Sequence, residues 1–202
     1  MHRASGILAV SFALLLALPA AQAATYTAIL NGATENPATP SSGIGGAIVT
    51  LDTTAHTLRV GASFSGLTGT TTAAHIHCCV APPGNVGVAT QTPSFVGFPL
   101  GVTSGSMDVT YDTTQAATWN AGFITNNGGT VAGAEAALAA GLAAGQAYLN
   151  IHSSAHTSGE IRGFLEFQAP AHPVPANSQW IMGGLVLLLA AGAWVVLRRR
   201  RG

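Results

Sequence analysis

The chain has 202 residues, of which only 7% are charged, whereas soluble globular domains usually carry roughly 25%. Seven arginines balance seven acidic residues, but five of the arginines lie at position 3 and positions 198–201, which leaves the residues between with a formal charge of −5. So few cations argue against nucleic acid as a partner, and a hydrophobic content of 48% argues against intrinsic disorder.

Residues 1–23 have the pattern of a secretory signal peptide. His2 and Arg3 precede an apolar run at residues 7–18, which is followed by Pro19 and the small-residue sequence Ala-Gln-Ala. The alternative, a first transmembrane helix, needs about 20 apolar residues, and this run is shorter. We therefore expect export, with cleavage after residue 23.

Residues 24–169 are long enough to form a domain with its own core. Short runs of β-branched and aromatic residues are separated by Gly, Pro, Asn and Ser, as is typical of strands and turns. About seven such runs predict a mainly β fold, an antiparallel β-sandwich or barrel. They are residues 26–30, 46–52, 57–64, 73–79, 105–111, 147–152 and 160–167.

Two segments of the domain depart from this strand pattern. Residues 131–146 are rich in Ala, with Leu138 and Leu142 four apart, which predicts one short helix that packs through a narrow apolar stripe. Residues 80–103 contain several prolines and show no strand pattern. A loop of that length is uncommon in a compact domain and is often functional.

The first candidate site is the His-Ile-His-Cys-Cys run at residues 75–79. Alternate residues of a strand share a face, so His75 and His77 project together, and two imidazoles at this spacing can bind one zinc or copper ion. Cys79 shares their face but lies about 13 Å from His75 along a regular strand, too far for the same ion. A complete site therefore needs either a bulge or a ligand from another segment.

The adjacent cysteines, Cys78 and Cys79, are the only two in the chain. Neighbouring Cα atoms are about 3.8 Å apart across a trans peptide, below the usual disulfide range, so a bridge between them would be strained. An oxidising compartment would still permit it. The alternatives are two free thiols, an intermolecular bridge or a ligand for a soft metal.

A second strand, residues 147–152, carries another imidazole. Tyr148, Asn150 and His152 share one face of it. If this strand pairs near the first, His75, His77 and His152 would form a cluster of three nitrogens with an open coordination position. The alternative is that the imidazoles form hydrogen bonds with backbone groups and carboxylates at the rim of the sheet.

The last predicted strand contains Gly-Glu-Ile-Arg-Gly at residues 159–163. Glu160 and Arg162 fall on one face, and Ile161, Leu165 and Phe167 on the other. We expect Glu160 and Arg162 to have a structural role, as an ion pair that orients this strand against a loop. Arg162 is one of two cations in the domain, so its loss should be disruptive.

His-Ile-His at 75–77, Tyr-Leu-Asn-Ile-His at 148–152 and Gly-Glu-Ile-Arg-Gly at 159–163 resemble the signature of the CHRD domain, over about residues 25–168. Ser153 stands where the family usually has Thr, and Ser158 where it has Pro. The resemblance implies a β-rich extracellular module of the type found in secreted bacterial proteins. In chordin the domain is bound up with growth-factor antagonism, but we carry no ligand over to this chain.

The C-terminal residues have the pattern of a membrane anchor. Residues 170–180 form a Pro-containing linker, 181–197 are 17 residues without a charge, and 198–202 are basic, which predicts a transmembrane helix with a cytoplasmic tail. Pro motif, helix and Arg run together resemble the PEP-CTERM and IPTL-CTERM sorting tails that exosortase-type enzymes process. A permanent single-pass anchor is the alternative, and both leave the domain outside the cytoplasmic membrane.

These observations favour a secreted or surface-displayed module without enzymatic activity. It would bind a ligand, such as envelope polysaccharide or matrix, through the long loop and the His-bearing rim, since no nucleophile elbow, Walker loop or dinucleotide fingerprint is present. The alternative is a mononuclear copper- or zinc-binding protein, similar to Cu/Zn superoxide dismutase, which also carries His-x-His on a β-sandwich. Residues 80–103 hold no His, Asp or Glu for a second metal subsite.

Overall fold

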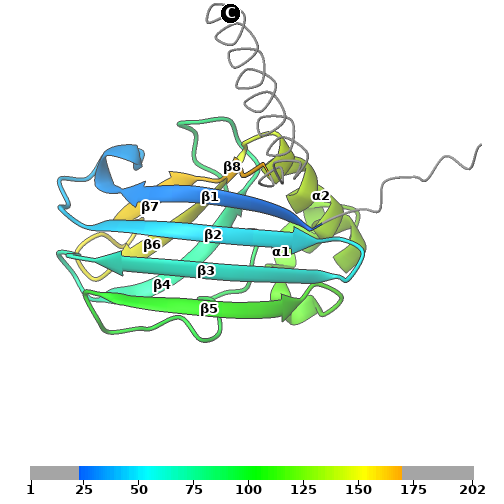
Figure 1. Cartoon of the computed structure of the whole chain (residues 1–202), viewed down its shortest axis with the longest axis horizontal. Coiled ribbons are helices and arrows are strands. Elements are labelled where there is room, and N and C mark those ends of the chain that lie inside the picture. Colours follow the sequence, from blue (N-terminus) through cyan, green and yellow to red (C-terminus); the bar gives the residue numbers. More distant parts are fainter. Residues whose placement is uncertain (1–22, 170–202) are drawn as a thin grey trace, which may run out of the picture. The chain divides into compact units, whose positions relative to one another are not determined.

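The computed structural model describes residues 23–169, which form eight antiparallel strands and two α-helices (Figure 1). Six of the seven predicted strands are present with ends that differ by one or two residues, and the seventh is interrupted. The strands are β1 (Ala24–Asn31), β2 (Ile44–Asp52), β3 (Thr57–Ser65), β4 (Thr71–Cys78), β5 (Gly105–Asp112), β6 (Ala147–Ser153), β7 (Ile161–Phe164) and β8 (Glu166–Phe167).

The strands form one sheet in the order β4-β6-β7-β1-β2-β3-β5, with β8 paired to β1. In Figure 1, β1, β2, β3 and β5 lie in front of β4, β6 and β7, because the sheet curls around its core. The two ends of the path, β4 and β5, do not pair with each other within the described residues. The fold is therefore an antiparallel half-barrel, which sharpens the predicted sandwich or barrel.

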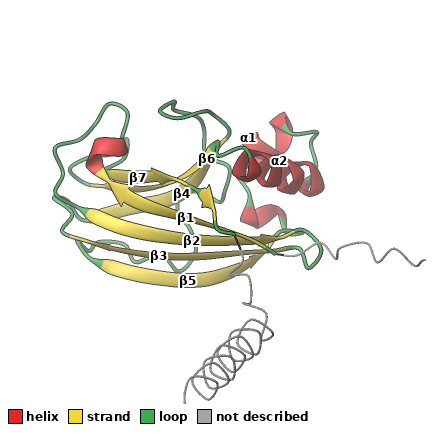
Figure 2. Cartoon of the chain, turned by 45° about the horizontal axis from the view of Figure 1, so that its top comes forward, coloured by secondary structure: helices red, strands yellow, loops and turns green. Residues whose placement is uncertain are grey.

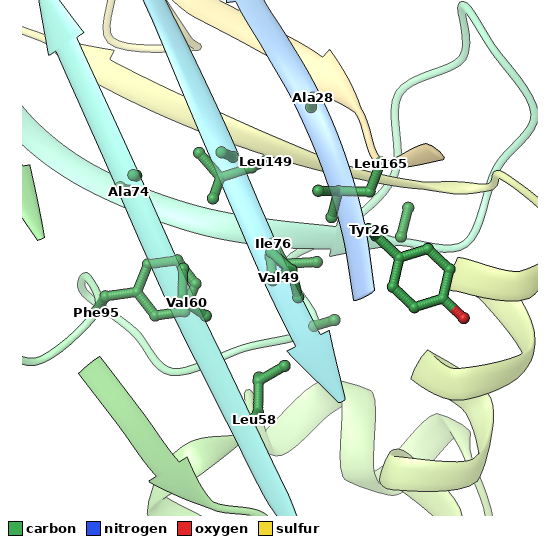
Figure 3. Close-up of a cluster of buried hydrophobic side chains, with 14 of the residues drawn as sticks. Tyr26, Ala28, Val49, Leu58, Val60, Ala74, Ile76, Phe95, Leu149 and Leu165 are labelled. Carbon is green, nitrogen blue, oxygen red and sulfur yellow. The ribbon is translucent and has the colours of Figure 1, made fainter. Parts of the chain in front are cut away.

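The core lies between the two halves of this curved sheet. Ile76 and Leu149 come from β4 and β6, whereas Val49 and Val60 come from β2 and β3, and all four side chains are fully buried. Figure 3 shows them in one cluster, with Phe95 of the long loop among them. Alternation explains the arrangement, because every second residue of each strand points to the core.

The long loop, residues 80–103, closes the open side of the half-barrel. Its backbone follows the free edge of β4, where the Ala89 amide donates to the Ile76 carbonyl (2.9 Å) and the Phe95 amide to the Ala74 carbonyl (3.1 Å). Phe95 also stacks on Tyr111 of β5, with ring centroids 5.7 Å apart. The loop thus covers an edge strand that would otherwise expose unpaired amides and carbonyls.

Two helices, α1 (Ala121–Asn126) and α2 (Val131–Ala143), lie together at one end of the sheet (Figure 2). The predicted helix is confirmed as α2, which buries Leu138 and Leu142 and ends three residues earlier than expected. Residues 121–126 were not predicted to be helical, because one and a half turns are too short to show a helical period. A side-chain cap marks the start of α1, where Asn120 accepts hydrogen bonds from two amides.

The predicted strand at residues 160–167 is divided by Leu165. The Leu165 amide donates to the Ala147 carbonyl (2.9 Å), and its side chain is fully buried. Ile161 and Leu165 are buried as expected, but Phe167, at the end of β8, is 59% exposed instead of lying in the core. It lies edge-on to Tyr26 on β1.

Four predicted segments lie outside the described residues: all but the last residue of the signal peptide (1–23), the linker (170–180), the transmembrane helix (181–197) and the basic tail (198–202). Within residues 23–169, neither helix has the length and apolar character needed to span a bilayer.

Candidate metal centre

The strand pairing brings the three predicted imidazoles together. β4 and β6 are antiparallel neighbours, with Ala73 opposite His152 and His75 opposite Asn150, so His75 and His152 lie diagonally across the pair. One ring nitrogen from each of His75, His77 and His152 lies within 4.8 Å of the others. His75 and His77 are buried, and His152 is partly buried. These rings project from the face of β4 and β6 opposite the apolar core.

Backbone carbonyls hold the other nitrogen of each ring. His75 Nε2 lies 2.7 Å from the Pro93 carbonyl oxygen, His77 Nδ1 lies 2.8 Å from that of Val86, and His152 Nδ1 lies 3.0 Å from that of Thr157. A carbonyl only accepts, so each of these nitrogens carries the proton.

The three converging nitrogens, His75 Nδ1, His77 Nε2 and His152 Nε2, are consequently unprotonated lone-pair donors. His77 Nε2 is buried and has no hydrogen-bond partner, and His75 Nδ1 lies 3.4 Å from His152 Nε2. Two unprotonated nitrogens at that distance cannot hydrogen-bond to each other. Metal-binding histidines have this same pattern, in which the outer nitrogen donates to a carbonyl and fixes the tautomer.

Burial keeps these imidazoles neutral. It lowers the pKa of His75 to about 4 and that of His77 to about 4, although the carbonyl of Pro93 or Val86 opposes this shift. Burial also lowers the pKa of His152. The neutral ring is the form that binds a metal. Within residues 23–169, none of the three imidazoles is hydrogen-bonded to a carboxylate. Of the alternative set of partners, backbone groups and carboxylates at the rim of the sheet, only the backbone groups are found.

An aromatic and cationic stack lies beside the cluster. Tyr148 on β6 is parallel to His77, with ring centroids 4.8 Å apart and planes at 4°. Arg162 on β7 lies over the Tyr148 ring, with its guanidinium carbon 4.7 Å from the centroid. Sequence reasoning placed Tyr148 on the His152 face but gave it no role.

Arg162 is buried and does not form the expected ion pair with Glu160. Its side chain donates to the carbonyls of Thr34 (2.6 Å) and Pro83 (2.9 Å) and to Asn85 Oδ1 (2.6 Å), and its nearest carboxylate is Glu35, at 3.8 Å. Burial raises the pKa of Glu35 to about 7, although Arg162 opposes this shift. The prediction failed because a glutamate distant in sequence lies nearer than the neighbour on the strand.

Glu160 is fully buried and accepts hydrogen bonds from uncharged groups. The Ser41 hydroxyl donates to its Oε1 (2.6 Å), as does the Thr68 hydroxyl (2.8 Å), and the Gly69 amide donates to Oε2 (3.3 Å). Burial raises its pKa, but the hydrogen bonds from Ser153, Ser41 and Thr68 outweigh this and bring it to about 2. Glu160 therefore stays ionised and fastens loops to the sheet.

Cys78 and Cys79 form a disulfide across a cis peptide bond, with Cα atoms 3.0 Å apart. The bridge that would be strained across a trans peptide is therefore present across a cis one. Cys78 belongs to the core and Cys79 is exposed, and a Cβ on Gly141 of α2 would overlap both sulfurs. The sulfurs thus pack against this helix, and neither belongs to the imidazole cluster.

The described domain matches a known protein family. A family model of the CHRD domain matches residues 26–165. The chain belongs to the CHRD domain family. No curated protein and no solved structure matches it. In this CHRD domain, the three sequence motifs that resemble the family signature lie on β4, on β6 and at the start of β7, which are adjacent strands.

Proposed function

We propose that this CHRD domain is a mononuclear copper- or zinc-binding module of the bacterial cell envelope. One observation carries the proposal: three neutral imidazoles direct unprotonated nitrogens to one point, and carbonyls hold the opposite nitrogens. Nitrogen ligands suit both ions, and divalent copper binds such sites more tightly than zinc. Three protein ligands leave one coordination position open.

We assign the module a binding role without enzymatic activity. Among the described residues, no carboxylate or thiol joins the three imidazoles, so the cluster has no side chain of these types to act as an acid, base or nucleophile. The alternative, binding of envelope polysaccharide or matrix through the long loop, has less support, because that loop covers β4 and orients His75 and His77. Retention of the domain by isolated envelope polysaccharide would favour that alternative.

Metal analysis of the purified domain tests the proposal. We expect about one copper ion per chain after dialysis against excess Cu(II), and His75→Ala and His152→Ala should each abolish stoichiometric binding. His156→Ala is the matched control, because His156 lies four residues from His152 and outside the cluster. Sub-stoichiometric metal in the unmodified domain, with both copper and zinc, would refute the proposal.

A further inference from the structure

The peptide of Val86 connects Tyr148 to the histidine on which it stacks. The Val86 carbonyl accepts from His77 Nδ1 at 2.8 Å and also faces the Tyr148 hydroxyl at 3.3 Å. The Val86 amide lies 3.3 Å from the same hydroxyl. One tyrosine thus packs against the imidazole plane and contacts the peptide group that fixes the imidazole tautomer.

Arg162 holds the chain immediately before Val86. It donates to Pro83 (2.9 Å), Gly84 (3.3 Å) and Asn85 (2.6 Å), which are three consecutive residues of the long loop. A buried guanidinium with this many acceptors has one preferred orientation. Because Arg162 also lies over Tyr148, the loop, the tyrosine and His77 form one continuous packed unit.

We propose that Tyr148 and Arg162 are positioning residues for His77, acting through the Val86 carbonyl. This inference rests on the proposed metal-binding function. A neutral imidazole has two tautomers, and only the one with its proton on Nδ1 leaves Nε2 free for a metal. With Val86 fixed, the metal-binding tautomer is already present in the metal-free protein. Without it, part of the binding free energy is spent on reorienting the ring.

The test compares two tyrosine variants of the purified domain. Tyr148→Phe keeps the stacked ring but removes the hydroxyl that contacts Val86. Tyr111→Phe is the matched control: Tyr111 is also buried and donates to a carbonyl of the same loop, that of Val96 (2.7 Å), but does not contact the imidazoles. We expect Cu(II) to bind Tyr148→Phe about 10-fold more weakly and to give a changed electron paramagnetic resonance spectrum. Tyr111→Phe should retain the affinity and spectrum of the unmodified domain.

A second variant covers the case in which Tyr148→Phe does not fold. Asn85 is exposed, so Asn85→Ala should fold while losing one of the bonds through which Arg162 holds the loop. It should weaken Cu(II) binding about 3-fold, and nitrogen NMR of the metal-free protein should show His77 losing its single Nδ1–H tautomer. Tighter or equal Cu(II) binding in both variants would overturn the positioning role. If the unmodified domain binds no copper or zinc, the proposed function itself fails.

Discussion

Arg59 and Arg162 are the two arginines of the described domain, and they differ in burial and in the groups that surround them. Arg59 is exposed on β3 and pairs with Asp108 on the neighbouring strand β5. Arg162 is 1% exposed and surrounded by carbonyls, aromatic rings and Glu35. An exposed pair contributes little to stability, whereas breaking a buried one leaves an uncompensated charge and unfilled acceptors.

Replacing these two arginines should therefore have unequal effects on the free energy of unfolding. We expect Arg162→Ala to lower it by about 3–5 kcal/mol, whereas Arg59→Ala should change it little. Urea unfolding of both variants beside the unmodified domain measures the difference. An unchanged midpoint in Arg162→Ala would remove its structural role.

The residues that sequence reasoning identified at the site are those whose own side chains carry the chemistry. His75, His77 and His152 could be found because their spacing gives them a common face. The carbonyls of Val86 and Pro93 could not, since every residue has a carbonyl and only the folded loop selects these two. For the same reason, the sequence could not indicate which backbone carbonyls accept hydrogen bonds from Arg162.

Among the secondary-structure elements, Glu160 joins segments that precede three different strands. Its carboxylate accepts from Ser41 before β2 and from Thr68 and Gly69 before β4, and it stands at the start of β7. Protonation would turn one carboxylate oxygen into a donor and remove the negative charge that strengthens these hydrogen bonds. The attachment of these segments to the sheet is thus sensitive to acid.

The pH dependence of folding should reveal this contribution. The pKa of Glu160 is about 2 in the folded domain, below its ordinary value of 4.5. Its stabilisation is therefore complete above about pH 4.5 and is lost as the pH falls toward 2, by at most about 3 kcal/mol. Glu160→Gln should lower stability at pH 7 and flatten the unfolding free energy between pH 5 and 2.

Glu166→Gln is the control for this experiment, because Glu166 is exposed on the adjacent β8. It should leave the unfolding free energy at pH 7 within about 0.5 kcal/mol of the unmodified domain. A pH profile of Glu160→Gln that coincides with that of the unmodified domain would show that the carboxylate does not couple folding to protonation.

The sequence predicted the strands well, because alternation extends over five or more residues in each. It did not predict the break at Leu165, where the amide continues the β6–β7 pairing by bonding to Ala147, and the next two residues pair with β1 as β8. A contact between segments that are 18 positions apart in the chain leaves no local pattern. The helix α1 was not predicted because its six residues are too few to show a helical period.

At the scale of the whole molecule, the curvature of the sheet and the closure of its open side were not predictable. Residues 80–103 gave no strand or helix signal, yet Phe95 completes the core between the two edges. What the sequence does predict at this scale is the destination of the chain. A signal peptide and a C-terminal anchor or sorting tail would enclose the CHRD domain.

Fractionation of bacterial cells that express the full chain tests this arrangement. We expect the mature protein to begin at Ala24, to lie outside the cytoplasmic membrane and to be retained in the envelope. A chain that ends at residue 169 should instead be released, because it lacks the apolar segment and the arginines of the tail. Recovery of the full-length protein from the cytoplasm with residues 1–23 intact would contradict the prediction, as would equal retention of both chains.

The imidazole cluster is assembled from segments that only the folded domain brings together. His75 and His152 are 77 positions apart in the chain, and two of the carbonyls that orient the rings, those of Val86 and Pro93, belong to the long loop that bonds to the free edge of β4. An unfolded chain threading across a membrane would hold none of this geometry. The proposed metal would therefore be acquired on the far side, and the metal supply of that compartment, rather than that of the cytoplasm, would decide which ion the domain carries.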